Sequence, residues 1–329
     1  MRDSSKMAAD LLSDVLNLVR ARCSISGRLV AGGSWGRRFA NLDAVKFCAA
    51  VKGDCWYFME GMATPLRFER GDVLVTNGSR SLVLASAPDL IADAVATSLS
   101  QDENGNYRLG LGEAFVMLGG MVQIDQRHQP LLLGGLPPLI HVSGAQYEAA
   151  NLAWLLEQIV REMRPPSRPG WPIVLAELAQ LLFVQTLRAY AMQSANSGGG
   201  WLRALGDRRL APALAAMHEN PKRAWSLEGL AQVAGMSRTS FVVHFRQVMG
   251  MPPLTYLTNW RMQLAERDLR GGASVAEVAE AIGYTSESAF SHAFKRLTGT
   301  APGQYRKATD EERTARELHA SASEATTTF

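Results

Sequence analysis

The chain has 329 residues, of which 47% are hydrophobic and 20% charged, a composition that indicates an ordinary soluble globular protein of two or three domains. No apolar run reaches the roughly 18 residues of a membrane span, and the N-terminus lacks a signal-peptide core, so we expect a cytoplasmic protein without a membrane partner. The net charge of +3 is uneven, because residues 201–307 carry 14 basic and 8 acidic side chains while residues 1–200 carry 18 of each. That excess of positive charge predicts phosphate contacts in the C-terminal third. The cysteines Cys23, Cys48 and Cys55 lack metal-binding spacing and predict free thiols.

The first predicted element is an amphipathic helix over residues 7–22, after which short strands follow one another. They are predicted at residues 25–31, 45–51, 55–59, 66–68, 73–76, 82–85, 107–111 and 114–124. Turn dipeptides such as Gly71-Asp72 and Asn77-Gly78 separate several of them. Many short strands at regular spacing predict a β-sandwich or a small barrel.

Two long helices are predicted next, at residues 145–163 and 172–192, with a proline-rich turn between them. Apolar residues cover more than half the circumference of the second helix, more than one neighbouring domain would cover. Two interpretations remain open: the helices pack as a pair on the strand domain, or they form a dimer interface across a two-fold axis. The candidate dimerisation residues are Leu152, Leu156, Ile159, Leu178, Leu181 and Leu182.

Two segments near the C-terminus repeat one pattern about 48 residues apart, at residues 226–250 and 274–299. Each opens with a serine that can cap a helix, breaks at a glycine, and restarts at a second serine. These residues are Ser226, Gly235 and Ser237 in the first segment, and Ser274, Gly283 and Ser286 in the second. Each second helix also carries two phenylalanines four residues apart. The repeat predicts two helix-turn-helix units.

A recognition helix places one face on the protein core and the opposite face on the base edges of the major groove. Periodicity predicts an inward face made of Phe241, Phe245 and Val248 in the first unit, and of Phe290, Phe294 and Leu297 in the second. The outward, candidate DNA-binding residues are Arg238, Thr239, Val242, Val243 and Arg246 in the first, and Glu287, Ser288, Ser291, His292 and Lys295 in the second. For Val242, packing against the following helix is the alternative.

A helix over residues 254–270 is predicted to link the two units. At 1.5 Å per residue it spans roughly 25 Å, which suits recognition helices in successive major grooves about 34 Å apart. Candidates for phosphate contacts, or for surface ion pairs, are Arg261, Arg267, Arg296 and Arg306. His244 is interpreted as a packing or phosphate residue.

The segments AGMSRTSF, MPPLTYLTNWRMQLAERDLR, VAEVAEAIGYTSESAFSHAFKR and TAPGQYR make residues 202–307 resemble the AraC/XylS family of bacterial transcription regulators. VKFCAAVKGDCWYF, FERGDVLVTNGSRSLVL and HQPLLLGGLPPLIHV are similar to the cupin-type sensor domain of one subgroup of that family. The resemblance implies double-stranded DNA, RNA polymerase, a small-molecule effector and a second copy of the chain as partners. It assigns base reading to Thr239, Val242, Val243, Glu287, Ser288 and His292. We expect an activator, although the residues do not distinguish activation from repression.

The strand domain departs from metal-binding cupins. Cys48 and Ser81 stand where related domains often have histidine, and His128 and His141 lie outside the predicted strands. Borderline-soft metal ions favour imidazole ligands, so we expect no metal, no cofactor and no catalytic residues. The candidate effector-binding residues are Trp56, Phe58 and Phe68, with core packing as the alternative role for each. Two alternative functions remain: a metal-independent or vestigial cupin enzyme fused to a DNA-binding module, and a regulator without a small-molecule ligand.

The predicted architecture is an α+β multidomain protein with a cupin-like β-barrel or sandwich, a central helical pair and an all-α domain with two helix-turn-helix motifs. The predicted divisions are a sensor domain at residues 1–142, a helical dimerisation region at 143–194, a flexible linker at 195–201, a DNA-binding domain at 202–307, and a disordered tail at 308–329.

Overall fold

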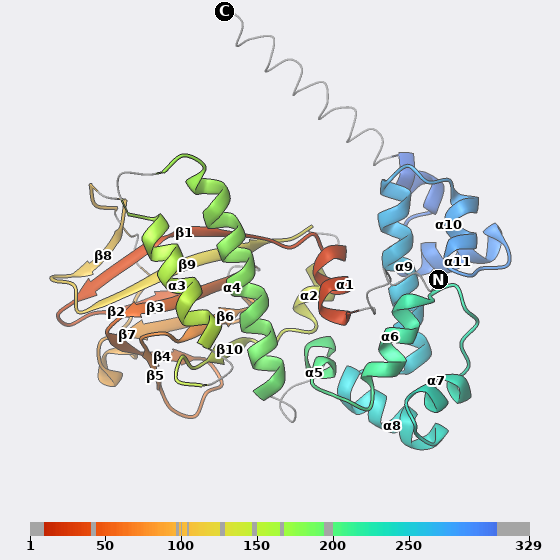
Figure 1. Ribbon diagram of the computed structural model, residues 1–329, viewed down its shortest axis with the longest axis horizontal. Helices are drawn as coiled ribbons and strands as arrows, with labels where there is room; N and C mark the ends of the chain where they lie inside the picture. Colours follow the sequence, from red (N-terminus) through yellow and green to blue (C-terminus); the bar gives the residue numbers. More distant parts are fainter. Residues whose placement is uncertain are drawn as a thin grey trace, which may run out of the picture. The chain divides into compact units, whose positions relative to one another are not determined.

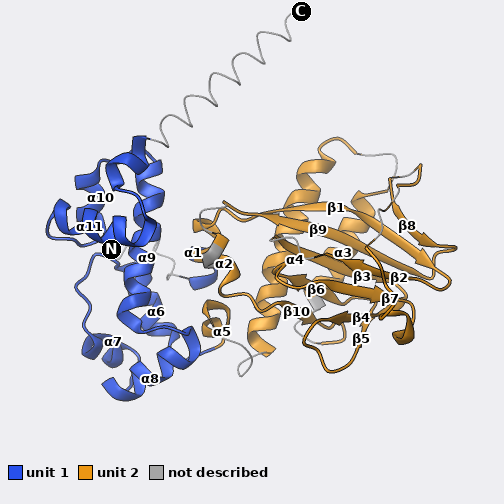
Figure 2. Cartoon of the chain, turned by 180° about the vertical axis from the view of Figure 1, so that it is seen from behind, with its two compact units in different colours: residues 1–14, 207–329 blue, residues 15–206 orange. Residues whose placement is uncertain are grey.

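A computed structural model describes residues 10–40, 44–96, 99, 101–103, 105–125, 129–146, 150–164, 168–193 and 200–307. The predicted tail, most of the predicted linker and His128 therefore lie outside the described residues. The chain forms two compact units, shown in Figure 2: unit 1 comprises residues 1–14 and 207–329, and unit 2 comprises residues 15–206. The boundary between the units falls at residue 206, after the predicted linker at 195–201.

Unit 2 contains two β-sheets. The six-stranded sheet has the order β10-β6-β3-β9-β1-β8, and the four-stranded sheet has the order β2-β7-β4-β5. The strands are β1 (Arg22–Gly32), β2 (Gly36–Phe39), β3 (Val45–Lys52), β4 (Asp54–Met59), β5 (Leu66–Glu69), β6 (Val73–Thr76), β7 (Leu82–Ala85), β8 (Tyr107–Gly110), β9 (Phe115–Gln123) and β10 (Leu139–Val142). Each of the eight predicted strands is confirmed. β2 and β10 were missed, because β2 has a single large apolar residue and β10 directly follows two prolines.

The core of unit 2 lies between the two sheets. Inward-facing side chains of both sheets meet there, among them Cys48 of β3, Tyr57 of β4, Phe68 of β5, Leu84 of β7 and Phe115 of β9. All five are buried, and the rings of Phe68 and Phe115 lie 6.0 Å apart between their centroids. The two sheets therefore form a sandwich whose core is built by apolar side chains from both layers, as the predicted class of fold requires.

Helices complete unit 2. They are α2 (Gln129–Leu133), α3 (Ala150–Glu162), α4 (Trp171–Gln193), α5 (Trp201–Leu205) and the 3-10 helix η1 (Pro88–Leu90), and the second half of α1 (Leu11–Leu18) also belongs to this unit. In Figure 1, α3 and α4 run side by side across the six-stranded sheet, and α4 packs on β1. Helix α5 contacts α4, and its Trp201 and Leu202 are buried, so this helix belongs to unit 2 although the sequence suggested a domain boundary here.

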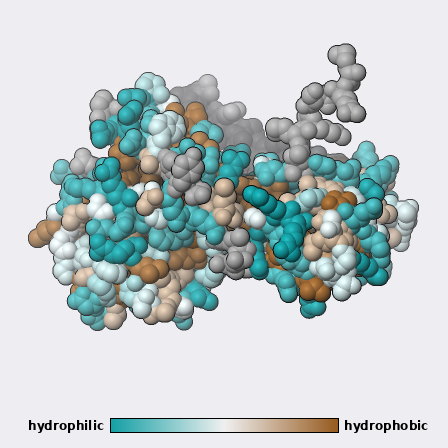
Figure 3. Space-filling view, turned by 60° about the horizontal axis from the view of Figure 1, so that its bottom comes forward, coloured by the Kyte–Doolittle hydropathy of each residue, from teal (hydrophilic) through white to brown (hydrophobic). Residues whose placement is uncertain are grey.

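The helix α4 is the longest helix of the described chain, with 23 residues. By length and composition it is apolar enough to cross a membrane, with a mean hydropathy of 1.3 over its most apolar window, of which 39% is buried inside the protein. A core helix of a soluble protein satisfies the same criteria. Its buried side, which includes Leu175, Leu182 and Phe183, packs within unit 2. On the face drawn in Figure 3, apolar side chains of the described residues lie in small groups between hydrophilic ones.

Unit 1 contains the two predicted helix-turn-helix units. Its helices are α6 (Ala211–Glu219), α7 (Leu227–Val233), α8 (Arg238–Met249), α9 (Pro253–Arg270), α10 (Val275–Ala281) and α11 (Glu287–Thr298). Helices α7 and α8 form the first helix-turn-helix unit, α10 and α11 form the second, and α9 runs between them in Figure 1. The turns pass through Gly235 and Gly283 at φ of 64° and 85°, the left-handed conformation that glycine adopts without strain.

The helix starts in unit 1 are set by local sequence. The side chains of four serines accept hydrogen bonds from backbone N–H groups three residues further on. They are Ser226, Ser237, Ser274 and Ser286. The carboxylate of Glu277 accepts a hydrogen bond from the backbone N–H of Ser274 and so completes a capping box. These caps confirm the four predicted helix starts.

Each helix-turn-helix unit has its own aromatic core. The ring centroids of Phe241 and Phe245 lie 5.6 Å apart, and those of Phe290 and Phe294 lie 5.5 Å apart. All four side chains are fully buried. The prediction that Leu297 also faces inward is wrong, since its side chain is 46% exposed. Leu297 lies in the last turn of α11, beyond the apolar cluster that encloses Phe290 and Phe294.

Candidate nucleic-acid interface and ligand cavity

The outward face of α8 is polar and basic around one apolar position. Arg238, Thr239 and Arg246 are exposed, Val243 is 52% exposed, and Val242 is half-buried. The Nε of Arg238 lies 3.1 Å from an Oε of Glu228 on α7, and both side chains are well exposed. An exposed ion pair of this kind contributes little to stability, so the guanidinium can exchange it for a phosphate. The surface of α8 can therefore present one methyl-bearing side chain between two cations.

The outward face of α11 is polar throughout. Glu287, Ser288, His292 and Lys295 are exposed, and Ser291 is half-buried. The acidic residue stands in the first helical turn, where a carboxylate is favoured by the helix dipole. Serine and histidine side chains offer single hydrogen bonds to base edges, and lysine offers a cation for phosphate. The two candidate recognition helices thus expose equivalent positions with different chemistry.

Two residues that the sequence left between alternatives have structural partners. His244 on α8 bonds through Nε2 to Oδ2 of Asp207 at 2.7 Å, which favours the packing role. Arg261 on α9 donates from Nε to the carbonyl of Pro221 at 2.7 Å and from a terminal nitrogen to that of Arg223 at 2.8 Å. Burial lowers the pKa of Arg261. Arg261 therefore holds the segment before α7 against α9 and is not presented to a phosphate.

The other candidate phosphate residues lie nearer the surface. Arg267 is an ion-pair partner of its neighbour Asp268, at 2.8 Å, and Arg296 is exposed on α11. Arg306 is half-buried just before the end of the described chain. Of the four candidates, Arg296 is the one that lies on a recognition helix with its side chain exposed.

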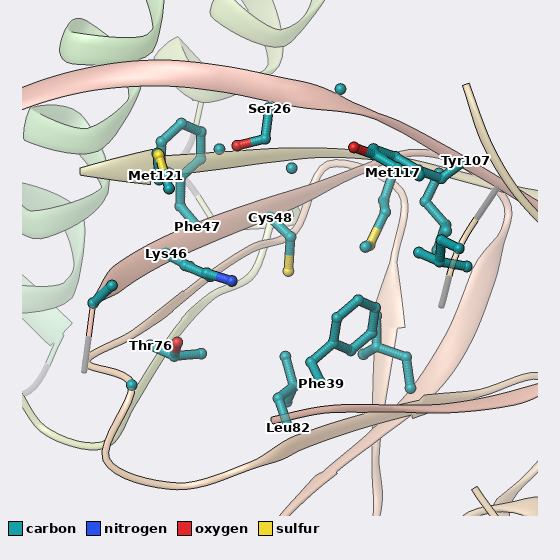
Figure 4. A pocket seen from close by; sticks show the side chains of 18 of the residues that line it. Ser26, Phe39, Lys46, Phe47, Cys48, Thr76, Leu82, Tyr107, Met117 and Met121 are labelled. Carbon is teal, nitrogen blue, oxygen red and sulfur yellow. The ribbon is translucent and has the colours of Figure 1, made fainter. Parts of the chain in front are cut away.

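Unit 2 contains a partly open cavity of about 250 Å³ between its two sheets, shown in Figure 4. Apolar side chains make most of its wall, among them Phe39 of β2, Leu82 of β7, Tyr107 of β8 and Met117 of β9. One charged side chain of β3, Lys46, reaches into the same space. The volume lies just below the range typical of pockets for small ligands, so the cavity fits a compact molecule.

The three predicted effector-binding residues do not line this cavity. Phe68 is fully buried in the core between the sheets, while Trp56 and Phe58 are half-buried and pack against Val83 and Ile91 on another side of the four-stranded sheet. Alternation along β4 directs Tyr57 inward and its two neighbours outward. The positions of these three side chains agree with the alternative role, which was packing in the core. The lining residues were missed because the strand positions alone do not show where the core is incomplete.

A hydrogen-bonded chain of buried and half-buried side chains joins β4, β10 and Asp72, the residue before β6. His141 lies on β10, a strand that the sequence did not predict, with Nε2 2.9 Å from Oδ2 of Asp72 and Nδ1 3.0 Å from the hydroxyl of Tyr57. Asp72 also accepts from the backbone N–H groups of Glu69 and Gly144, both at 2.9 Å. Burial, and then the nearby Asp72, raise the pKa of Tyr57 to about 12, which keeps its hydroxyl protonated as a donor to His141. The chain thus satisfies every polar group and fixes β10 to the sheet.

The described residues contain no group of three or more histidine, cysteine, aspartate or glutamate side chains that could hold a metal ion. Cys23, Cys48 and Cys55 are free and buried. Burial raises the pKa of the Cys23 and Cys48 thiols to about 12, and it also raises that of Cys55. At neutral pH these thiols are protonated and therefore poor nucleophiles and poor metal ligands.

The candidate dimerisation residues fall into two groups. Leu152, Leu156, Ile159 and Leu182 are buried within unit 2, so their side chains are not available to a second copy. Leu178 is half-buried, and Leu181 is 42% exposed. Other exposed apolar side chains of the same two helices include Trp154 on α3 and Ile173 on α4. Any interface on these helices would use that exposed set and not the buried stripe.

The sequence of unit 2 matches a known family, and so does that of unit 1. Residues 10–192 match the cupin family, and residues 230–308 match the helix-turn-helix domain family. A cupin unit joined to two helix-turn-helix motifs defines a class of DNA-binding transcription regulators.

Known proteins with the same arrangement are similar along almost their whole length. A putative AraC-like transcription regulator of Streptomyces lividans is 38% identical over 300 residues, which are 91% of this chain and 98% of that protein. The RCS-specific transcriptional activator RclR of Escherichia coli is 36% identical over 303 residues, 91% of this chain and 97% of its own. The solved DNA-binding domain of AdpA, in complex with a target DNA, is 36% identical, with a TM-score of 0.31, and matches 32% of this chain and 96% of that one. The chain belongs to the AraC-like transcription regulators, and it is a regulator and not an enzyme.

Proposed function

We propose that this regulator activates transcription by placing α8 and α11 in successive major grooves, under the control of a small molecule held in unit 2. The observation that carries the DNA-binding part is the repeated geometry of the two helix-turn-helix units. Each buries a phenylalanine pair of the same spacing and leaves the opposite helix face exposed. Helix α9 has 18 residues, a length of roughly 27 Å, which suits a separation of about one turn of the duplex.

The base-reading residues in this proposal are Thr239 and Val243 on α8, and Glu287, Ser288 and His292 on α11. All five are exposed. Arg238, Arg246 and Lys295 supply phosphate contacts, while Val242 and Ser291 stand at the edge of each face. Activation is proposed because the RclR relative is named a transcriptional activator. An activator of transcription would have RNA polymerase as its protein partner and would act in the cytoplasm.

Salt dependence tests the phosphate contacts. We expect the affinity of the full chain for a selected duplex to fall steeply as salt rises, with a slope that grows by about 0.9 for each neutralised phosphate. Lys295→Ala is expected to lower that slope by about one and to weaken binding similarly on all sequences. Equal affinity at low and high salt would exclude the proposed contacts.

The effector part rests on the cavity of unit 2, whose wall is apolar except for a few polar groups, as in sites for small molecules. A regulator without a ligand would leave such a space without function. The test is the change in DNA affinity on addition of a ligand that binds the cavity.

We also propose that the chain acts as a homodimer through the exposed faces of α3 and α4. The supporting observation is the exposed apolar set of Trp154, Ile173 and Leu181 on these helices. Leu181→Asp is expected to shift the protein to monomer in sedimentation equilibrium while its melting temperature stays unchanged. Leu111→Asp is the matched control, because Leu111 is 90% exposed and lies outside these helices. A dimer that survives Leu181→Asp would rule out this interface.

A further inference from the structure

The cavity of unit 2 contains a lysine where strand geometry calls for an apolar residue. On β3 the side chains of Lys46, Cys48 and Ala50 share one face, because alternate residues of a strand point the same way. Cys48 and Ala50 are buried in the core between the sheets. Lys46 continues that inward face, and Figure 4 shows its ammonium and the Cys48 sulfur pointing into the same space.

Within the described lining of the cavity, positive charge is not balanced. The basic residues Lys46 and Arg80 line it with their side chains, and the described lining includes no aspartate or glutamate. Arg80 donates to the backbone carbonyl of Glu60 at 2.8 Å, which leaves its charge uncompensated. A cation that is partly removed from water is stabilised by an anion brought close to it.

The surroundings of Lys46 suggest the shape of that anion. In the sheet register Lys46 lies opposite Thr76 of β6 and Met121 of β9, and all three line the cavity. The Thr76 hydroxyl is a second donor beside the ammonium. Further along the cavity the wall is apolar, made by Phe39, Leu82 and Met117. The site therefore has two hydrogen-bond donors at one end and an apolar wall at the other.

We infer that the cavity binds a small carboxylate with an apolar body, its head group on Lys46 and Thr76 and its body against the aromatic and aliphatic wall. This inference rests on the proposed control of the regulator by a small molecule and specifies the chemical class of that molecule. The neutral thiol of Cys48 lies beside the head group as a weak donor. At about 30 Å³ for each water-sized group, a volume of about 250 Å³ admits roughly eight such groups, the size of a medium-chain or single-ring acid.

Burial lowers the pKa of Lys46, as expected for a cation that is partly removed from water. Two consequences follow for Lys46→Met, which keeps the length of the side chain and removes its charge. The variant is expected to be at least as stable as the unaltered chain near neutral pH. It is also expected to lose affinity for the acid and not for an uncharged analogue.

The experiment uses the full chain and two probes that differ in the head group, octanoate and octan-1-ol, with binding measured by calorimetry. The unaltered chain is expected to prefer octanoate, and Lys46→Met to weaken octanoate binding by about tenfold or more, as expected for loss of a charge-assisted contact. Octan-1-ol binding should stay within about twofold. Lys52→Met is the matched control, since Lys52 lies exposed at the end of the same strand, and it should change neither affinity. Lys46→Arg, which keeps the charge, should retain the preference for the acid.

The inference is overturned if the unaltered chain does not bind octanoate, if it binds octan-1-ol equally well, or if Lys46→Met binds octanoate unchanged. The affinity for a selected duplex, measured with and without octanoate, separates this inference from the proposed function. Lys46-dependent binding of octanoate without any change in DNA affinity would uphold the ligand class and exclude effector control by this acid. A chain that binds octanoate but no DNA would contradict only the DNA-binding proposal.

Discussion

The two units of this regulator differ in where their proposed functional side chains point. In unit 1 the proposed base-reading residues point to solvent, and the buried face of each recognition helix holds only apolar side chains such as Phe245 and Phe294. In unit 2 the proposed ligand-binding residue Lys46 points inward, among side chains that otherwise build the core. Substitutions on the exposed faces of α8 and α11 can therefore change function without changing stability. In unit 2 a substitution in the interior can change both ligand binding and stability.

The largest effects are expected from the aromatic cores of unit 1. Phe245→Ala and Phe294→Ala each remove a fully buried ring and should cost about 3–5 kcal/mol of local stability. Because Phe245 contacts Tyr256 near the start of α9, and Phe294 contacts Tyr305, the two losses should stay local. Hydrogen exchange of the full chain should show faster exchange in α7 and α8 for Phe245→Ala, and in α10 and α11 for Phe294→Ala. Equal effects on both helix pairs would mean that the two helix-turn-helix units share one core.

The next effect concerns the buried chain of unit 2. Asp72→Asn should destabilise unit 2 by on the order of 3 kcal/mol at neutral pH, because it removes a charged acceptor of three hydrogen bonds. Burial alone would raise the pKa of Asp72, but the bonds from His141, Glu69 and Gly144 outweigh it and lower that pKa. The carboxylate therefore stabilises the fold above its unfolded pKa of about 3.9, and this contribution is lost as pH falls through the lower folded value. Thermal unfolding as a function of pH should show the difference between Asp72→Asn and the unaltered protein narrowing in acid. A constant difference down to acid pH would refute this role of Asp72.

A smaller effect is expected at the polar face of α11. His292→Ala should weaken DNA binding by about 1 kcal/mol and relax base preference at one position, because the exposed imidazole offers one hydrogen bond. Lys295→Ala is the comparison, since loss of a phosphate contact weakens all sequences alike. Fluorescence anisotropy on a panel of duplexes with single base changes distinguishes these outcomes. A uniform loss for His292→Ala would make it a phosphate contact.

Much of unit 1 could be predicted because its signals are local. Serine caps, turn glycines and phenylalanines four residues apart define each helix within about twenty-five residues, and the structure has all of them. The exception is Leu297, where periodicity continued an inward face past the end of the apolar cluster. Periodicity gives the direction of a side chain and not the extent of the core that it meets.

The cavity of unit 2 could not be predicted in the same way. Residues 45–50 of β3 are buried on both faces, apart from Lys46, so the alternation that normally separates core from surface is lost. Its neighbours β6 and β9 come from distant parts of the sequence, and only their pairing brings Thr76 and Met121 beside Lys46. The one available signal was a lysine two residues before Cys48, on the same face of a strand that otherwise reads as buried.

The measurement that tests the central claim most directly is a randomised-site selection with the unaltered chain, Val243→Arg and Leu254→Arg. Both variants replace an exposed apolar residue by the same cation, but Val243 lies on the outward face of α8 and Leu254 lies at the start of α9. An arginine in the groove grips guanine with two hydrogen bonds and discriminates by about 1–3 kcal/mol. We predict that Val243→Arg raises overall affinity and selects guanine at one position of one half-site, while Leu254→Arg leaves every base preference as it was. If the base preferences of Val243→Arg equal those of the unaltered chain, α8 does not read the groove through this face, and the account is contradicted.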